Sequence, residues 1–244
     1  MEDIQPKFVD FQHDLTFGKT KSNLPVIYKQ NTENDIFELA FHYEFGNQAD
    51  NRYAIAFDYI DLLGTKKLSN EDIQKQFYAL ACQTSFEVTD QSLYITITGL
   101  NENLAPALSL LEDLMHNAKV DREAYSQFVE QTLKQREDGK KNQKTCFNAL
   151  WNYALYGPYN PVRNVMTADQ LKQTDPQSLL DMISDLSNIN HTVLYYGPSQ
   201  MKDIVALVSK QHKTGKTLKT PLANKLYVQQ QTPSNEVIIA PYDA

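Results

Sequence analysis

The stretch "RYAIAFDYIDLLGTKKLS", residues 52–69, decides how the fold of this sequence is interpreted. Asp50 and Asn51, which precede it, are good helix-capping residues, and Gly64 is typical of a helix end. The stretch therefore predicts a helix over 52–63. Taken alone, it is an ordinary buried helix with one polar side, because charged residues on a core helix usually face water.

The composition describes a folded, acidic protein. Its 244 residues are 41% hydrophobic and 11% aromatic, which is enough for a substantial core in one large domain or two small ones. The formal charge is −7 and no long basic stripe balances it, which argues against a nucleic-acid partner. No run of about 18 apolar residues is present, so no membrane span is expected.

Neither the N-terminus nor the cysteines fix the compartment. The first residues, "MEDIQPKFVDFQHD", lack the basic start and apolar stretch of a signal peptide, so the signal of an exported protein would lie outside this chain. Cys82 and Cys146 form no close metal-type pair and are expected to be free, mostly buried thiols.

The pattern of hydrophobic residues predicts an α+β fold. Alternating apolar residues are typical of strands, and helical spacing behind a capping residue is typical of helices. Strands are expected over 24–30, 36–46, 84–88, 92–99 and 191–198, with the clearest hairpin turn at 90–91. Helices are expected after Ser69, Asn101, Asp121 and Asp175, and over 201–208.

A core domain is expected to cover residues 1–210. Residues 211–235 are polar and lack periodicity, which is typical of a linker or an extended arm. Residues 236–240, "EVIIA", predict a new apolar strand, and a strand is normally paired within its own domain. We therefore expect 211–244 to be a linker and the first strand of a following, truncated domain, so that the sequence is a segment of a longer polypeptide.

The helix over 52–63 has the frame of a zinc-peptidase motif. Zinc peptidases place two imidazoles four residues apart on a helix, and in the inverted motif, His-x-x-Glu-His, a glutamate directly precedes the second histidine. Here the strand end "HYEFGNQADN" (42–51), the helix and the closing pair Gly64–Thr65 resemble the insulinase or pitrilysin-type zinc peptidases, which include the mitochondrial processing peptidases. The resemblance covers about residues 20–210.

The zinc ligands of that motif are absent from this sequence. Counting back from Gly64 puts the two histidine positions at Ile55 and Tyr59 and the glutamate position at Asp58. Ile55 has no donor atom, and a tyrosine phenol must lose a proton with a pKa near 10 before it binds zinc. Asp58 is one methylene shorter than glutamate and has no metal-bound water to deprotonate. We therefore expect no metal ligand, no cofactor and no catalytic residue in this chain.

Few other residues are candidates for a site. The family's third ligand, a glutamate, would fall in the window 127–161, where Glu130 and Glu137 are available, but a lone glutamate does not hold zinc. The basic run 134–144 predicts a solvated helix face, or an inter-domain or substrate-facing surface. The histidines are scattered without ligand spacing and are expected to be structural or exposed: His13, His42, His116, His191 and His212.

The resemblance implies a LuxS/mitochondrial-processing-peptidase-like αβ-roll, in which an antiparallel sheet packs on helices. It implies a domain of the non-catalytic half, which forms a chamber wall and contacts unfolded peptide substrates. The catalytic half, with zinc, would lie in the same chain or in a partner chain. This chain alone would then be no enzyme, and its parent would be a zinc metalloendopeptidase of the bacterial cytoplasm or periplasm.

Two points stay open at this stage. The alternative function is a catalytically silent interaction subunit of a processing-peptidase-like complex. The substrate-binding residues are unknown, because Tyr53 and the aromatic residues of 41–46 fit a chamber wall and a packed sheet equally well.

Overall fold

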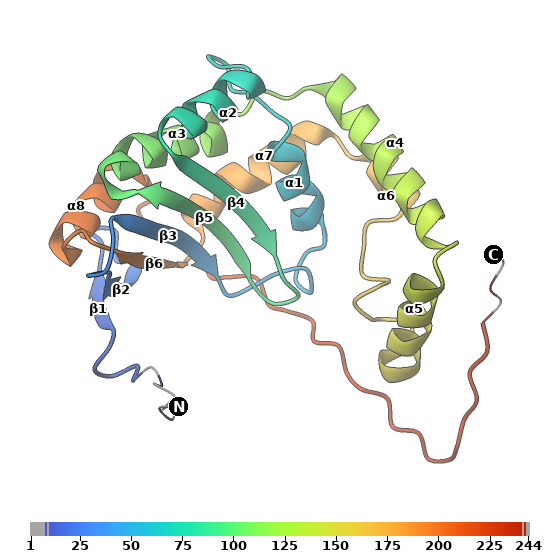
Figure 1. The fold of residues 1–244 in the computed structure, drawn as a ribbon. Helices are drawn as coiled ribbons and strands as arrows, with labels where there is room; N and C mark the ends of the chain where they lie inside the picture. Colours follow the sequence, from blue (N-terminus) through green and yellow to red (C-terminus); the bar gives the residue numbers. More distant parts are fainter. Residues whose placement is uncertain (1–7, 9, 241, 243–244) are drawn as a thin grey trace, which may run out of the picture.

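A mixed β-sheet forms the centre of the fold in this computed structural model, which describes residues 8, 10–240 and 242 (Figure 1). The described strands are β1 (Thr16–Lys19), β2 (Pro25–Gln30), β3 (Ile36–Tyr43), β4 (Cys82–Val88), β5 (Leu93–Leu100) and β6 (Thr192–Gly197). Their order is β1-β2-β6-β3-β5-β4. The β2–β6 pair is parallel and the other neighbours are antiparallel, so β1 and β4 are the edges.

The helices cover one face of this sheet and extend beyond one end of it (Figure 1). They are α1 (Arg52–Ile60), α2 (Asn70–Ala79), α3 (Leu104–Asn117), α4 (Arg122–Gly139), α5 (Gln143–Tyr156), α6 (Ala168–Gln173), α7 (Pro176–Asp185) and α8 (Met201–Gln211). Helices α1, α3 and α8 contact strands β4, β5 and β2, respectively, and α7 packs on α1 and α3. None of the helices in the described residues has the length and apolar character needed to cross a membrane.

Strand β3, in the middle of the sheet, shows why one face is buried. Its residues alternate between the helix side and the open side of the sheet, with a period of two. Glu38 is exposed and His42 is half-buried on the open side. The helix-side residues are fully buried: Phe37, Leu39, Phe41 and Tyr43. Burial of these large side chains fixes which face the helices cover.

The predicted α+β fold is confirmed, with one correction to the sheet. The hairpin of β4 and β5 and the start of α2 are as expected, and the side chains of Ser69 and Asp72 form a reciprocal capping box there. The sheet is not purely antiparallel, because β6 enters parallel to β2 and lies between β2 and β3. Cys82 is buried and Cys146 is half-buried, and both are free thiols.

Three elements were not predicted, and one predicted strand is absent. Strand β1 and helices α5 and α6 have no counterpart in the expected pattern. Residues 236–240 carry no strand pairing in the structure, and Val237 and Ile239 are 88% and 86% exposed. An isolated strand has no hydrogen-bond partners, so pairing of this segment requires a neighbour outside the described residues. The following domain stays a prediction.

The expected linker is held against the domain rather than free. The side-chain amide of Asn224 donates to the carbonyl oxygens of Glu44 and Gln91, both at 3.2 Å, and its oxygen accepts from the backbone N–H of Gly46 at 3.0 Å. Three hydrogen bonds from one side chain join the linker to the loop after β3 and to the β4–β5 turn.

A strained residue between α2 and β4 gives a test of this geometry. Ala81 has a φ of 48°, in the left-handed region that costs a residue with a Cβ atom about 1–2 kcal/mol. We expect Ala81→Gly to raise the free energy of unfolding by about 0.5–1 kcal/mol, because glycine adopts this conformation without strain. Urea denaturation measures the change.

Ala79→Gly is the matched control for this substitution. Ala79 is equally exposed but lies in the last turn of α2, where glycine costs up to about 1 kcal/mol relative to alanine. Equal destabilisation by both substitutions would show that Ala81 is not strained.

Candidate functional site

Helix α1 lies where the zinc motif of the resembled peptidases would lie. It begins after Asn51 and packs against α7 and β4. The two histidine positions face the core, because Ile55 is 6% exposed and Tyr59 is 0% exposed. Asp58 lies on the neighbouring, solvent-facing side and is exposed. The side of α1 that would carry the metal is therefore part of the hydrophobic core.

The hydroxyl of Tyr59 has a structural role. It donates to the carbonyl oxygen of Asp121 at 2.7 Å and accepts from the backbone N–H of the same residue at 3.0 Å. Its ring meets that of Tyr125 edge to face, with centroids 5.1 Å apart. Burial raises the pKa of the Tyr59 phenol, so it stays protonated at neutral pH. This side chain links α1 to the start of α4 and does not act as a metal donor.

The third-ligand window contributes no metal donor to α1. Glu130 is exposed on α4, and Glu137 forms a surface ion pair with Lys140 at 2.6 Å. Within the described residues, no three His, Cys, Asp or Glu side chains are grouped so that they could hold a metal ion. The donors present around α1 do not fit a zinc site.

Two carboxylates lie on the solvent side of α1, next to a groove. Asp61 lines an open groove of about 750 Å³ between the end of α1, helix α2 and the first residues of β4. Partial burial, together with the neighbouring charge of Asp58, raises the pKa of Asp61 to about 6. Partial burial also raises the pKa of Asp58. The two carboxylates make this end of the groove acidic. Ionisation of Asp61 costs free energy there, because the carboxylate is partly buried and close to Asp58.

Strand β4 is an open sheet edge beside this groove. Among the described strands it pairs only with β5, so one row of its backbone N–H and C=O groups lacks a strand partner. Its seven residues, "CQTSFEV", contain no Lys or Pro, the residues that usually protect an edge. The other edge, β1, has four residues and ends in Lys19. The two edges therefore differ, and only β4 offers a long unprotected one.

The aromatic residues considered as wall residues belong to the core. Tyr53 is 4% exposed, and its ring packs edge to face against that of Phe45 at 5.4 Å. The aromatic residues of β3 face the helices and are fully buried. Sheet and helix packing accounts for these side chains.

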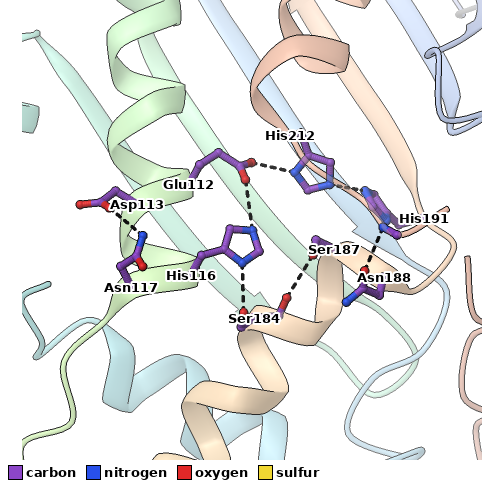
Figure 2. A network of polar contacts seen from close by, with 10 residues as sticks. Glu112, Asp113, His116, Asn117, Ser184, Ser187, Asn188, His191 and His212 are labelled. Atoms are coloured by element: carbon purple, nitrogen blue, oxygen red, sulfur yellow. Dashed lines mark hydrogen bonds and ion pairs between the residues drawn. The ribbon is translucent and has the colours of Figure 1, made fainter. Parts of the chain in front are cut away.

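A buried cluster of Glu112, His116, His191 and His212 joins α3 to the residues before β6 and after α8 (Figure 2). Nδ1 of His212 lies 2.7 Å from one carboxylate oxygen of Glu112, and its Nε2 lies 3.1 Å from Nε2 of His191. The other oxygen of Glu112 lies 3.4 Å from Nε2 of His116. Side chains from three separate parts of the sequence thus meet, with Glu112, His191 and His212 buried and the side chain of His116 28% exposed.

The hydrogen bonds fix the protons of this cluster. Nδ1 of His191 lies 2.7 Å from the carbonyl oxygen of Ile189, which only accepts, so this nitrogen carries a proton. Burial and the charge of His212 lower the pKa of His191 to about 4, so its Nε2 accepts at neutral pH. His212 therefore donates from its Nε2 to Nε2 of His191, while its Nδ1 lies against the carboxylate of Glu112.

The surrounding histidines stabilise the carboxylate of Glu112. Burial alone would raise the pKa of Glu112, but hydrogen bonds from His116 and His212 outweigh it and leave the pKa lowered. Both nitrogens of His212 are engaged by other side chains, so they are not free to bind a metal. The cluster is structural, and it holds the end of α8 to α3.

The sequence contained one signal for this cluster. Glu112 and His116 are four residues apart on α3, on a side otherwise occupied by Leu108, Leu111 and Met115. A carboxylate on a core-facing side needs a partner. His191 and His212 gave no such signal, because only the tertiary fold brings them together.

Comparison with known proteins identifies the fold. No family model matches the sequence, and no curated protein matches it either. The periplasmic protease PqqL from Escherichia coli matches with a TM-score of 0.73 and 14% identity, over 93% of this chain and 26% of that one. The ferredoxin protease FusC, solved in complex with Arabidopsis ferredoxin, matches with a TM-score of 0.74 and 12% identity, over 94% of this chain and 27% of that one.

A third solved structure is a peptidase M16 inactive domain from Pseudomonas fluorescens. It matches with a TM-score of 0.71 and 15% identity, over 87% of this chain and 53% of that one. The chain therefore has the fold of M16 peptidase domains, and the resemblance to insulinase-type peptidases is confirmed at the level of the fold. It spans about a quarter of the PqqL and FusC chains and about half of the inactive-domain structure.

The raised pKa of Asp61 predicts a pH-dependent stability. Its folded-state pKa of about 6 lies above the unfolded value of about 3.9, so its charge destabilises the fold at neutral pH and the cost disappears as pH falls toward 4. We expect Asp61→Asn to raise the melting temperature at pH 7.5 by about 1–2 °C and to have no effect near pH 4.

Asp58 provides the control for this experiment. Asp58→Asn removes the neighbouring charge, so the gain from Asp61→Asn should shrink in that background. A gain that is independent of pH would show that the carboxylate charge of Asp61 is not its source.

The buried carboxylate of Glu112 predicts a larger effect. Glu112→Gln removes the buried carboxylate that His212 and His116 contact, and breaking a buried hydrogen-bonded charged group costs about 3–5 kcal/mol. We expect a loss of about 3 kcal/mol in urea denaturation at pH 7. Because the folded state lowers the pKa of Glu112, the loss should diminish as pH falls below the unfolded-state value of about 4.3.

Glu102→Gln is the control for this substitution, since Glu102 is exposed at the start of α3. It should change the unfolding free energy by less than about 0.5 kcal/mol. A similar small change for Glu112→Gln would contradict the stabilising contacts of the buried carboxylate.

Proposed function

We propose that this chain is a non-catalytic domain of an insulinase-type zinc peptidase, and that it forms part of a chamber wall that contacts peptide substrates. The observation that carries the proposal is the donor-free α1 within an M16 peptidase fold. At the two ligand positions, Ile55 packs in the core and the Tyr59 hydroxyl is bonded to Asp121. Zinc and cleavage then belong to a catalytic half, in the same chain or in a partner chain.

We propose the same domain organisation that the sequence indicates. Residues 1–210 form the wall domain, and residues 211–244 lead from it into a following domain. The hydrogen bonds of Asn224 hold this connecting segment to the loop after β3 and to the β4–β5 turn, so the segment leaves the wall domain along a defined path.

The open edge of β4 is the part of this wall that contacts a peptide. An extended peptide adds to a sheet edge through backbone hydrogen bonds, and neighbouring pockets then select among its side chains. Beside β4 the groove offers Asp61, Glu71 and Lys75 as charged groups, with Phe77 and Tyr78 as apolar ones. Backbone pairing requires an unfolded segment, so this contact favours unfolded peptides over folded proteins.

The first test asks whether this chain itself binds zinc or cleaves peptides. The purified chain, dialysed against zinc, is expected to retain no stoichiometric zinc by elemental analysis and to leave an unstructured fluorogenic peptide uncleaved. A zinc site needs three or four donors, which α1 does not supply. One tightly held zinc per chain, with chelator-sensitive cleavage, would overturn the proposal.

The second test addresses peptide binding at β4. A fluorescein-labelled unstructured peptide is titrated with the chain, and a second peptide carries N-methyl groups on alternate residues along one edge. Because N-methylation removes the N–H donors that pair with β4, we expect it to weaken binding at least about 10-fold, equal to about 1.4 kcal/mol.

A third peptide, methylated on the other set of alternate residues, is the matched control. It has the same composition, but its methyl groups point away from the strand it joins, so its affinity should stay close to that of the unmodified peptide. Equal loss in both methylated peptides, or no binding of the unmodified one, would exclude β4 as the contact.

A further inference from the structure

Helix α5 carries an exposed aromatic surface. None of its fourteen residues is buried. Phe147 and Trp151, four residues apart and therefore on one side of the helix, are 63% and 55% exposed. Their rings stack with centroids 6.4 Å apart. Figure 1 shows α5 set apart from the sheet. Stacked aromatic side chains on an outlying helix are typical of a surface that another folded unit covers.

The C-terminal segment runs beside the same helix (Figure 1). The backbone N–H of Gln230 donates to the carbonyl oxygen of Leu155 at 2.7 Å, near the end of α5. The hydroxyl of Tyr242 donates to the carbonyl oxygen of Lys141 at 2.8 Å, just before its start. Both ends of α5 are therefore in contact with this segment, and the exposed apolar residues at 237–239 lie between the two contacts.

The charge around α5 differs from that of the whole chain. Residues 139–168 contain Lys140, Lys141, Lys144 and Arg163 and no Asp or Glu, whereas the chain has a net charge of −7. Lys144 lies three residues before Phe147, on the same side of the helix. The aromatic surface thus has a basic rim, which is complementary to an acidic partner.

We infer that α5 is the docking face for the domain proposed to follow residue 236, with Phe147 and Trp151 as its centre and Lys140, Lys141 and Lys144 as its rim. This inference rests on the proposed domain organisation. The contact of Tyr242 with Lys141 selects this occupant, because it places the chain at residue 242 beside the start of α5. In the proposed following domain, residues 236–240 would form a strand, and its exposed residues Val237 and Ile239 would lie beside the start of α5.

The test compares one substitution in two contexts. Phe147→Ser/Trp151→Ser is made in the 244-residue chain and in the natural polypeptide that includes the following domain. The exposed side chains make few contacts in the short chain, so its melting temperature should change by less than about 1 °C. In the longer polypeptide, wild-type α5 amides should exchange at least about 10-fold more slowly than in the short chain, and the double variant should abolish that protection.

Two controls keep the outcome specific. Tyr78→Ser removes a more exposed aromatic residue, on α2, and should leave α5 exchange unchanged in both contexts. Lys140→Glu/Lys141→Glu/Lys144→Glu tests the basic rim and should reduce the protection of α5 in the longer polypeptide.

Three results would overturn the inference. The first is a natural polypeptide without a following domain, and the second is unprotected α5 amides in the longer polypeptide. The third is a blue shift of Trp151 emission with vesicles of anionic phosphatidylglycerol, which would indicate that α5 binds a lipid surface. Trp151 is the only tryptophan of the chain, so this signal is unambiguous. A concentration-dependent shift of the short chain alone would indicate a second copy. Peptide binding at β4 is measured separately. An absence of that binding would contradict the proposed function, whereas retained binding with unprotected α5 amides would contradict only this inference.

Discussion

The bond between Tyr59 and Asp121 is the interaction on which the rest of this structure depends. It joins α1, which packs on the covered face of the sheet, to the first residue before α4. A metal ion held by α1 would need a donor at position 59 that points to the ion. The hydroxyl of Tyr59 instead donates to one carbonyl oxygen and accepts from one backbone N–H. The present packing therefore fixes α1 to the start of α4 and does not fit a metal site on α1.

Local sequence was sufficient for elements that bury one side. Strand β5 alternates cleanly, and α2 carries its capping box, so both were predictable. It was not sufficient for α5, whose aromatic residues bury nothing in this chain, or for β1, which is too short to show a period. The parallel entry of β6 next to β2 depends on packing between segments over 150 residues apart, which no local pattern encodes. That Ile55 and Tyr59 stand at the motif's two histidine positions follows from their fixed distances before Gly64.

The cluster around Glu112 is a second feature that only the tertiary structure assembles. Glu112 alone would be a costly residue on the inner side of α3. In the fold its carboxylate lies 2.7 Å from Nδ1 of His212, and Phe41 stacks on the ring of His212 at 4.2 Å. The same region holds the chain after α8, since Gly215 donates to Asn188 at 2.9 Å. Contacts after α8 therefore fix the start of the C-terminal segment, and the hydrogen bonds of Asn224 fix it again further along the chain.

Metal coordination at α1 and peptide pairing at β4 would use different atoms of this domain. Coordination needs specific side chains at two positions of α1, and single substitutions there abolish it. Pairing along β4 needs only backbone groups, which every residue except proline supplies in full. The identities of Ile55 and Tyr59 therefore leave the backbone groups of β4 unchanged. In the proposed wall domain, binding energy spread along this edge would orient a peptide for cleavage in the catalytic half.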